Sequence, residues 1–217
     1  MLNTNDIDFY VKPQGFPKLL EYIIDHGYEV SISLNKPRSH SSLTGCSVPL
    51  NTRSYTSSTH IGIILDMHHR SSKLKKINII VSLDSHIVTT ITNFHSTVVM
   101  NFVAWYRLVC LYPHWTMKNV GLVNREYINY QIFDKYQKRG FTLCASVKLI
   151  DGNRHRCYRN PYCPMKLRTL NDDTQLFLPF NNVHLSFNEL EPNIPWMLNT
   201  ACVSEVHIIQ IPSLMIS

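Results

Sequence analysis

Along residues 7–34 the spacing of apolar residues changes from that of a strand to that of a helix and back again. This succession constrains the fold more than any other feature of the sequence. Residues 7–11 form a short apolar run of strand length. Residues 16–26 place apolar side chains at helical spacing, and Gly27 suits the end of a helix. Residues 28–34 alternate apolar and polar side chains, which is typical of a half-buried strand. The pattern predicts strand, helix and strand in succession.

Two further β-branched runs follow a long polar stretch. Residues 36–58 are rich in Ser, Thr, Asn and Pro and predict a loop. Residues 60–65 and 77–83 have the composition and length of strands. The basic segment 70–76 between them predicts the turn of a hairpin.

The rest of the chain predicts a mixture of helices and strands. We expect helices near residues 86–104 and 127–138 and strands near residues 107–112 and 141–149. The predicted fold class is therefore α+β, a small mixed β-sheet with helices packed on one face. A weak boundary near residue 151 separates a core, 1–150, from a loop-rich C-terminal extension, 151–217, which is either an appendage or part of the same domain.

Charge and composition limit the classes of partner. Hydrophobic residues make up 44% of the 217-residue chain, which is enough for a core. The net charge of +6 permits binding to nucleic acid, nucleotides or anionic membranes. The positive residues are scattered, however, so no sequence feature supports a nucleic-acid interface beyond this charge. The oligomeric state is not indicated.

Membrane segments and cysteine motifs are absent from the sequence. No run reaches the roughly 18–20 apolar residues of a spanning helix, and the first residues do not resemble a signal peptide. We therefore expect no membrane partner and an intracellular location, cytoplasmic or nuclear. The six cysteines include no CxxC pair, so buried thiols are favoured over a zinc site or a disulfide.

Two aspartates at the start of the first strand are the clearest candidate for chemistry. Asp6 and Asp8 are two positions apart, so their side chains share one face of a strand. Two adjacent carboxylates repel each other unless a cation lies between them, and Mg²⁺ prefers such oxygen ligands. The motif alone has low specificity, since most such pairs are exposed acids without a metal.

Longer blocks of sequence give the aspartates a context. The block Asn5-Asp6-Ile7-Asp8-Phe9-Tyr10-Val11 and the helix after it resemble the DxD strand and helix of the nucleotidyltransferase superfamily. The block Lys76-Ile77-Asn78-Ile79-Ile80-Val81-Ser82 resembles the strand that holds the third carboxylate of that family. The block 91–102 resembles a helix found in uncharacterised fungal proteins with a degenerate nucleotidyltransferase core. The resemblance covers roughly residues 5–150.

The resemblance implies Asp6 and Asp8 as Mg²⁺ ligands and a nucleoside triphosphate as partner, but two departures stand against activity. Active members have a Gly-Ser turn before the DxD strand, and only five residues precede Asp6, so we expect an N-terminally incomplete core. Asn78 occupies the position of the third carboxylate. A neutral amide cannot act as general base and binds Mg²⁺ weakly. Asp84 is a poor substitute, about 20 Å further along an extended strand.

Three functional hypotheses follow from these residues. The first is a degenerate nucleotidyltransferase-like protein that retains weak Mg-nucleotide binding without turnover. The second is a non-catalytic protein-interaction domain on the same scaffold. The third is an active Mg-dependent nucleotidyltransferase with an unconventional base. The first requires the strand that holds Asp6 and Asp8 to lie beside the strand that holds Asn78.

Overall fold

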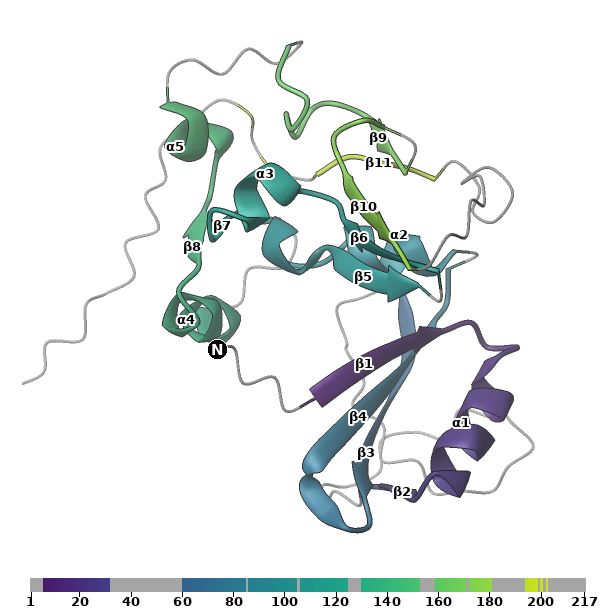
Figure 1. Cartoon of the computed structure of the whole chain (residues 1–217). Helices are drawn as coiled ribbons and strands as arrows, with labels where there is room; N and C mark the ends of the chain where they lie inside the picture. Colours follow the sequence, from purple (N-terminus) through teal and green to yellow (C-terminus); the bar gives the residue numbers. More distant parts are fainter. Residues whose placement is uncertain are drawn as a thin grey trace, which may run out of the picture. The chain divides into compact units, whose positions relative to one another are not determined.

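The structure is a computed structural model of an α+β protein with several small sheets (Figure 1). It describes residues 6–31, 60–84, 86–104, 106–124, 130–152, 159–170, 172–180, 194–198, 200 and 202. The predicted α+β class is confirmed, but the strands of the described residues form several small sheets and not one. In the same residues, no helix has both the length and the apolar character that a bilayer span requires. The loop predicted at 36–58 lies outside the described residues.

The chain divides into two compact units, residues 1–90 and 91–217. This division lies at a different place from the boundary that the sequence suggested near residue 151. The limits 1–150 for a family-like core stay a prediction that rests on the resemblance.

The first unit is a four-stranded mixed sheet with one helix. β1 pairs with β4 in parallel, β4 pairs with β3 as an antiparallel hairpin, and β3 pairs with β2, also antiparallel. The strand order is therefore β1-β4-β3-β2. Its elements are β1 (Asp6–Val11), α1 (Phe16–Asp25), β2 (Tyr28–Val30), β3 (Ile61–His69) and β4 (Ser72–Ser82).

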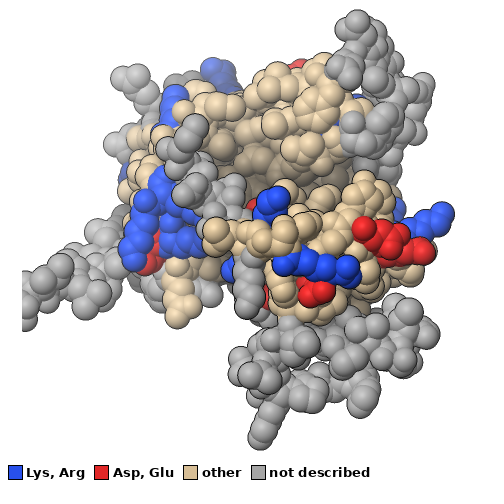
Figure 2. Space-filling model, turned by 60° about the horizontal axis from the view of Figure 1, so that its bottom comes forward, with Lys and Arg blue, Asp and Glu red and all other residues tan. Residues whose placement is uncertain are grey.

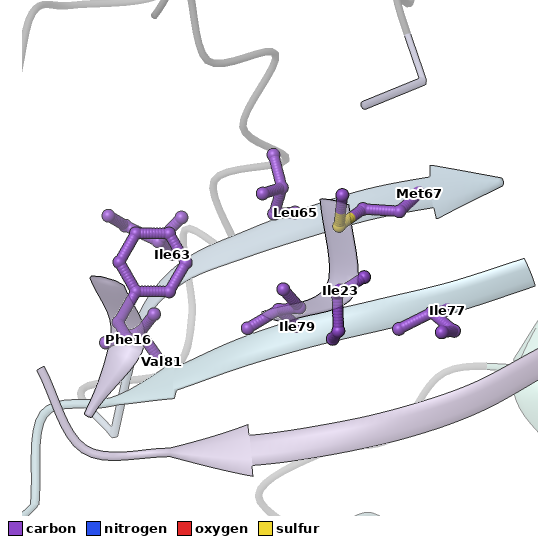
Figure 3. Packing of buried hydrophobic residues seen from close by; sticks show 8 residues of the cluster. All are labelled: Phe16, Ile23, Ile63, Leu65, Met67, Ile77, Ile79 and Val81. Carbon is purple, nitrogen blue, oxygen red and sulfur yellow. The ribbon is translucent and has the colours of Figure 1, made fainter. Parts of the chain in front are cut away.

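Helix α1 covers one face of this sheet and closes a hydrophobic core. Alternate residues of β3 and β4 point toward the helix, as their period of two requires (Figure 3). Leu65 and Ile79 are completely buried there. The core residues are Phe16, Ile23, Ile63, Leu65, Met67, Ile77, Ile79 and Val81. Residues at the intervening positions therefore face the other side of the sheet.

The predicted elements of this unit are largely confirmed, and the hairpin is longer than expected. Gly27 ends α1 with φ 86°, a conformation that glycine adopts without strain. The segment 70–76 was predicted to be the turn because it is basic and polar. In the structure β4 begins at Ser72 and β3 continues to His69, so the turn is short. Backbone pairing with neighbouring strands outweighs the polar character of these residues.

The second unit holds shorter elements in three small sheets. The sheets have the orders β10-β6-β5, β11-β9 and β7-β8. Helix α2 (Ile87–Thr92) spans the boundary between the units. The other elements are the 3-10 helix η1 (Thr97–Val99), β5 (Asn101–Ala104), β6 (Arg107–Cys110), α3 (Pro113–Thr116), β7 (Val120–Leu122), α4 (Tyr130–Lys138), β8 (Thr142–Cys144), α5 (Val147–Asp151), β9 (Arg168–Thr169), β10 (Leu176–Pro179) and β11 (Pro195–Trp196).

Two elements predicted for this unit are wrong. The helix expected at 86–104 ends at Thr92, and residues 101–104 form a strand that pairs with β6. Its β-branched side chains favour helix only weakly, and strand pairing replaces the helical hydrogen bonds. The strand expected at 141–149 ends at Cys144, and α5 begins three residues later. The strand predicted at 107–112 corresponds to β6, which ends at Cys110, and the helix predicted at 127–138 is confirmed by α4 over the described residues.

A buried arginine organises the second unit. Arg168 is only 2% exposed. Its Nε donates to Asp172 Oδ2 at 2.8 Å, and its Nη1 donates to the carbonyl of Leu111 at 2.9 Å. The guanidinium lies 4.5 Å from the centre of the Tyr112 ring. Burial alone would raise the pKa of Asp172, but hydrogen bonds from Arg168 and Thr174 outweigh it and lower the pKa to about 2.

Leu65→Ala tests the core of the first unit. Removing this fully buried side chain should destabilise the protein by about 2–5 kcal/mol, through lost burial and the cavity left behind. Leu74→Ala in the same hairpin is the matched control, since Leu74 is 75% exposed. Its effect should stay within about 0.5 kcal/mol. Urea denaturation measures both, and equal losses would contradict the described core.

Asp172→Asn tests the buried ion pair through pH. The folded pKa of about 2 lies below the ordinary 3.8, so the carboxylate stabilises the fold above pH 3.8 and loses this effect as pH falls toward 2. The variant should have a lower free energy of unfolding than wild type at pH 7. The difference between the two free energies should be smaller by about 2 kcal/mol at pH 2. Asp173→Asn, on the exposed neighbour, is the control for urea denaturation at both pH values. A gap that does not change with pH would contradict the pairing.

Candidate functional site

Strand β1 presents Asp6 and Asp8 on the face of the sheet opposite α1. Both side chains are exposed, whereas Ile7 and Phe9 point to the helix side. Within the described residues β1 pairs only with β4, so it is an edge strand of this sheet. The two carboxylates therefore stand on an accessible edge, which is a position that can receive a ligand.

The expected neighbourhood of the acids and residue 78 is confirmed by the strand register. Asp8 pairs with Asn78, and Asp6 pairs with Lys76. Paired residues in neighbouring strands point to the same face, so all four side chains share one surface. The parallel pairing of β1 with β4 thus brings together residues about 70 positions apart in the sequence.

A hydrogen bond joins the two central residues of the site. Asn78 Nδ2 donates to Asp8 Oδ1 at 2.7 Å. An ionised carboxylate only accepts hydrogen bonds, so the amide must present its N–H₂ group to Asp8. The amide thus gives Asp8 Oδ1 a hydrogen-bond donor, where a carboxylate at position 78 would repel it. Asp8 therefore needs no cation to offset a neighbouring negative charge at that position.

A third aspartate in the same row was missed by sequence reasoning. Asp66 on β3 pairs with Asn78 from the other side, which gives the row Asp8, Asn78, Asp66 across three strands. It was missed because the predicted strand ended at residue 65. Aligning the β-branched runs 60–65 and 77–83 as the two strands of a hairpin could have placed Asp66 opposite Asn78. Two strand spacings, about 10 Å, separate the backbones of Asp8 and Asp66.

The donor set of this row fits weak binding of one Mg²⁺ ion and does not fit a two-metal centre. In the described part of the chain, no group of three or more His, Cys, Asp or Glu side chains is arranged to hold a metal ion. Asp6 and Asp8 supply two hard oxygen donors, and water or phosphate would have to supply the remainder. Asp66 is too distant to share one ion with Asp8, because Mg²⁺ holds its oxygen ligands at about 2.1 Å.

Asp84 belongs to a separate network beyond the end of β4. It accepts a hydrogen bond from His60 Nδ1 at 2.9 Å and one from Thr90 Oγ1 at 3.0 Å. Its backbone N–H donates to Ser82 Oγ. These partners hold the chain between β4 and α2, and they engage Asp84 away from the row of Asp8 and Asn78.

A second polar cluster lies in the other unit. It includes His95, which falls within the helix that the sequence predicted at 86–104 but beyond the end of α2. The backbone N–H of Asn124 donates to the carbonyl of His95 at 2.8 Å. His95 Nδ1, Ser96 Oγ and Asn124 Oδ1 are buried, and the structure gives none of them a hydrogen-bond partner. Burial lowers the pKa of His95 to about 4, with a smaller contribution from the charge of Lys135. The imidazole is therefore neutral at pH 7, and the described residues around it include no nucleophile–base pair.

On the face shown in Figure 2, Lys and Arg side chains stand next to Asp and Glu side chains. In the first unit Arg70 Nε pairs with Glu29 Oε1 at 2.8 Å. This mixture gives no added support to a nucleic-acid interface.

Comparison of the chain with protein-family models, with curated proteins and with solved structures finds no match in any of the three.

Proposed function

We propose that the first unit is a degenerate nucleotidyltransferase-like core that binds a Mg-nucleoside triphosphate weakly and does not turn it over. The observation that carries this proposal is the register of β1 and β4, with the Asp8 carboxylate hydrogen-bonded to Asn78. The sequence resemblance supplies the class of ligand, and the strand pairing supports it.

Three side chains on the edge of the sheet supply what such a ligand needs. Asp6 and Asp8 would hold one Mg²⁺, since the Cα atoms of alternate strand residues lie about 7 Å apart and their carboxylates can approach one ion from two sides. Lys76 lies beside Asp6 and is exposed, so its ammonium group can contact a phosphate. Bound Mg²⁺ would neutralise phosphate charge and orient the ligand against this edge.

The same geometry explains why turnover is not expected. A general base must lie within hydrogen-bond reach of the proton that it removes. At the position of the third acid stands Asn78, whose amide is neutral and donates to Asp8. The next carboxylate in the row, Asp66, lies one strand further away. The site can therefore bind an ion and phosphate but has no base beside them.

A non-catalytic interaction domain is the second candidate, and the opposite face of β1 favours it. Ile7 is 59% exposed and Phe9 is 37% exposed, although both point to the helix side of the sheet. They lie on β1, which pairs only with β4 among the described residues and is therefore an edge strand. The two candidates thus place function on opposite faces of one strand, and variants can separate them.

Calorimetric titration with Mg-ATP tests the proposed function. Wild type should bind with a dissociation constant on the order of 1 mM, as expected for two carboxylates and one lysine on an exposed edge. Asp6→Ala combined with Asp8→Ala should abolish the heat, and Ile7→Ser on the opposite face should leave it unchanged. No heat from folded wild type at millimolar nucleotide would remove the proposal. Turnover of labelled nucleotide that the double variant loses would instead establish an active enzyme.

Asn78→Asp tests the role of the amide. The change removes the hydrogen bond to Asp8 and places a third negative charge beside it, so Mg²⁺ should bind roughly tenfold more tightly. The free protein should also lose thermal stability and regain it with added Mg²⁺. Asn78→Ala is the matched control, since it removes the hydrogen bond without adding charge. If Asn78→Asp binds Mg²⁺ no better than Asn78→Ala, the row is not a metal site.

A further inference from the structure

Two cysteines far apart in the sequence meet in the interior of the second unit. The sulfur atoms of Cys163 and Cys202 lie 3.3 Å apart, and the residues are separated by 39 positions. Cys163 is 1% exposed and Cys202 is 7% exposed. The prediction of buried thiols is confirmed for the four cysteines that the structure describes. The close approach of two of them was not predicted.

Cys202 lies in the segment 194–202, which places alternate side chains in the core. Every second residue from 194 to 202 is buried, while Pro195 and Met197 between them are exposed. The buried residues are Ile194, Trp196, Leu198, Thr200 and Cys202. Among the described residues of this series, Pro195 and Trp196 form the strand β11, and Thr200 and Cys202 lie at bends.

Side chains hold much of this segment to the rest of the unit. Among the described residues of this segment, only Pro195 and Trp196 pair with another strand, β9. Trp196 Nε1 donates to Tyr112 Oη at 3.2 Å, and Thr200 Oγ1 donates to the carbonyl of Val123. A segment with few backbone hydrogen bonds opens more readily than the core of a sheet. A covalent bond at its end would therefore change how firmly it is held.

We propose that Cys163 and Cys202 are a modification site, at which a low-molecular-weight disulfide such as oxidised glutathione converts the thiol pair into an intramolecular disulfide. A disulfide bond is about 2.05 Å long, so the sulfurs need to approach by only about 1.3 Å. Side-chain rotation supplies a movement of this size without displacing the backbone.

The reaction proceeds by two thiol–disulfide exchanges. One cysteine, as its thiolate, attacks a sulfur of the small disulfide, which forms a mixed disulfide and releases one small thiol. The second cysteine thiolate attacks the protein sulfur of that mixed disulfide and releases the second small thiol. The two protons lost by the cysteines are taken up by the two leaving thiolates. The protein loses two electrons, and the small disulfide gains them.

The burial of both sulfurs determines when the exchange takes place. A small disulfide cannot reach a sulfur that is 1% exposed, so the C-terminal segment must open before it reacts. Once formed, the cross-link closes a loop of about 40 residues and restricts the unfolded chain, which stabilises the folded state. Oxidation would thus link the segment 194–202 covalently to Cys163, and reduction would remove this link and allow the segment to open.

Zinc binding is the competing use of two neighbouring thiolates. Zinc holds each sulfur at about 2.3 Å in a tetrahedron, which places two sulfurs about 3.8 Å apart. The sulfurs here are closer than that, and the described residues supply no group of three ligands that includes them. The geometry favours the disulfide.

Refolding the full chain in a glutathione redox buffer tests the proposal. The oxidised protein should lose about 2 Da in intact mass, with one peptide cross-link that joins Cys163 to Cys202. Its Tm should exceed that of the reduced protein by roughly 5–15 °C. Cys163→Ala should abolish both changes, and Cys144→Ala, at another buried cysteine of this unit, should retain them.

Three results would overturn the proposal. The first is a refolded wild-type protein that keeps its full mass at every glutathione ratio or carries only glutathione adducts. The second is a cross-link that joins other cysteines. The third is stoichiometric zinc that co-purifies with the native protein and protects both thiols. Because the mass and the cross-link are measured on wild type, the test holds even if Cys163→Ala does not fold.

Discussion

The parallel pairing of β1 with β4 is the constraint on which the candidate site depends. Hydrogen bonds between the two strands fix a register in which Asp8 lies beside Asn78. The register follows from burial, because β4 must place Ile77, Ile79 and Val81 against α1. A shift by one residue would turn these apolar side chains away from the helix. The core on one face of the sheet thus determines which polar residues meet on the other.

Within that register, the identity of residue 78 decides what the edge can do. A carboxylate there would add charge to Asp8 and require a cation, whereas the amide donates a hydrogen bond and leaves Asp8 satisfied. The hydrogen bond is exposed to solvent, so it contributes little to stability. Its importance is chemical, because it places a neutral donor, and not a second acid, beside Asp8.

Much of the first unit could be predicted from the sequence because its periodicities are clean. The change from period two to helical spacing and back located β1, α1 and β2, and Gly27 marked the end of the helix. The same reasoning placed Asp6 and Asp8 on one face. It missed Asp66 because charged and polar residues ended the predicted strand too early, while in the structure backbone pairing carries β3 on to His69.

The second unit was harder to predict because its determinants are distant in the sequence. Residues 87–102 have apolar side chains at helical spacing, yet the last of these residues belong to β5, which pairs with β6. Arg168 reaches Leu111, 57 positions away, and Cys163 meets Cys202, 39 positions away. No local pattern shows such contacts. They appear only when the strands and turns are packed together.

Paramagnetic broadening by Mn²⁺ in the ¹H–¹⁵N spectrum of the full chain would show whether the edge formed by β1 and β4 binds a metal ion. Mn²⁺ prefers the same oxygen ligands as Mg²⁺ and broadens signals of nuclei near it. The account predicts that substoichiometric Mn²⁺ first broadens the amide signals of Asp6 to Asp8 and Lys76 to Asn78, and that excess Mg²⁺ restores them. Broadening that begins elsewhere, or that leaves these two strand segments unaffected, would contradict it.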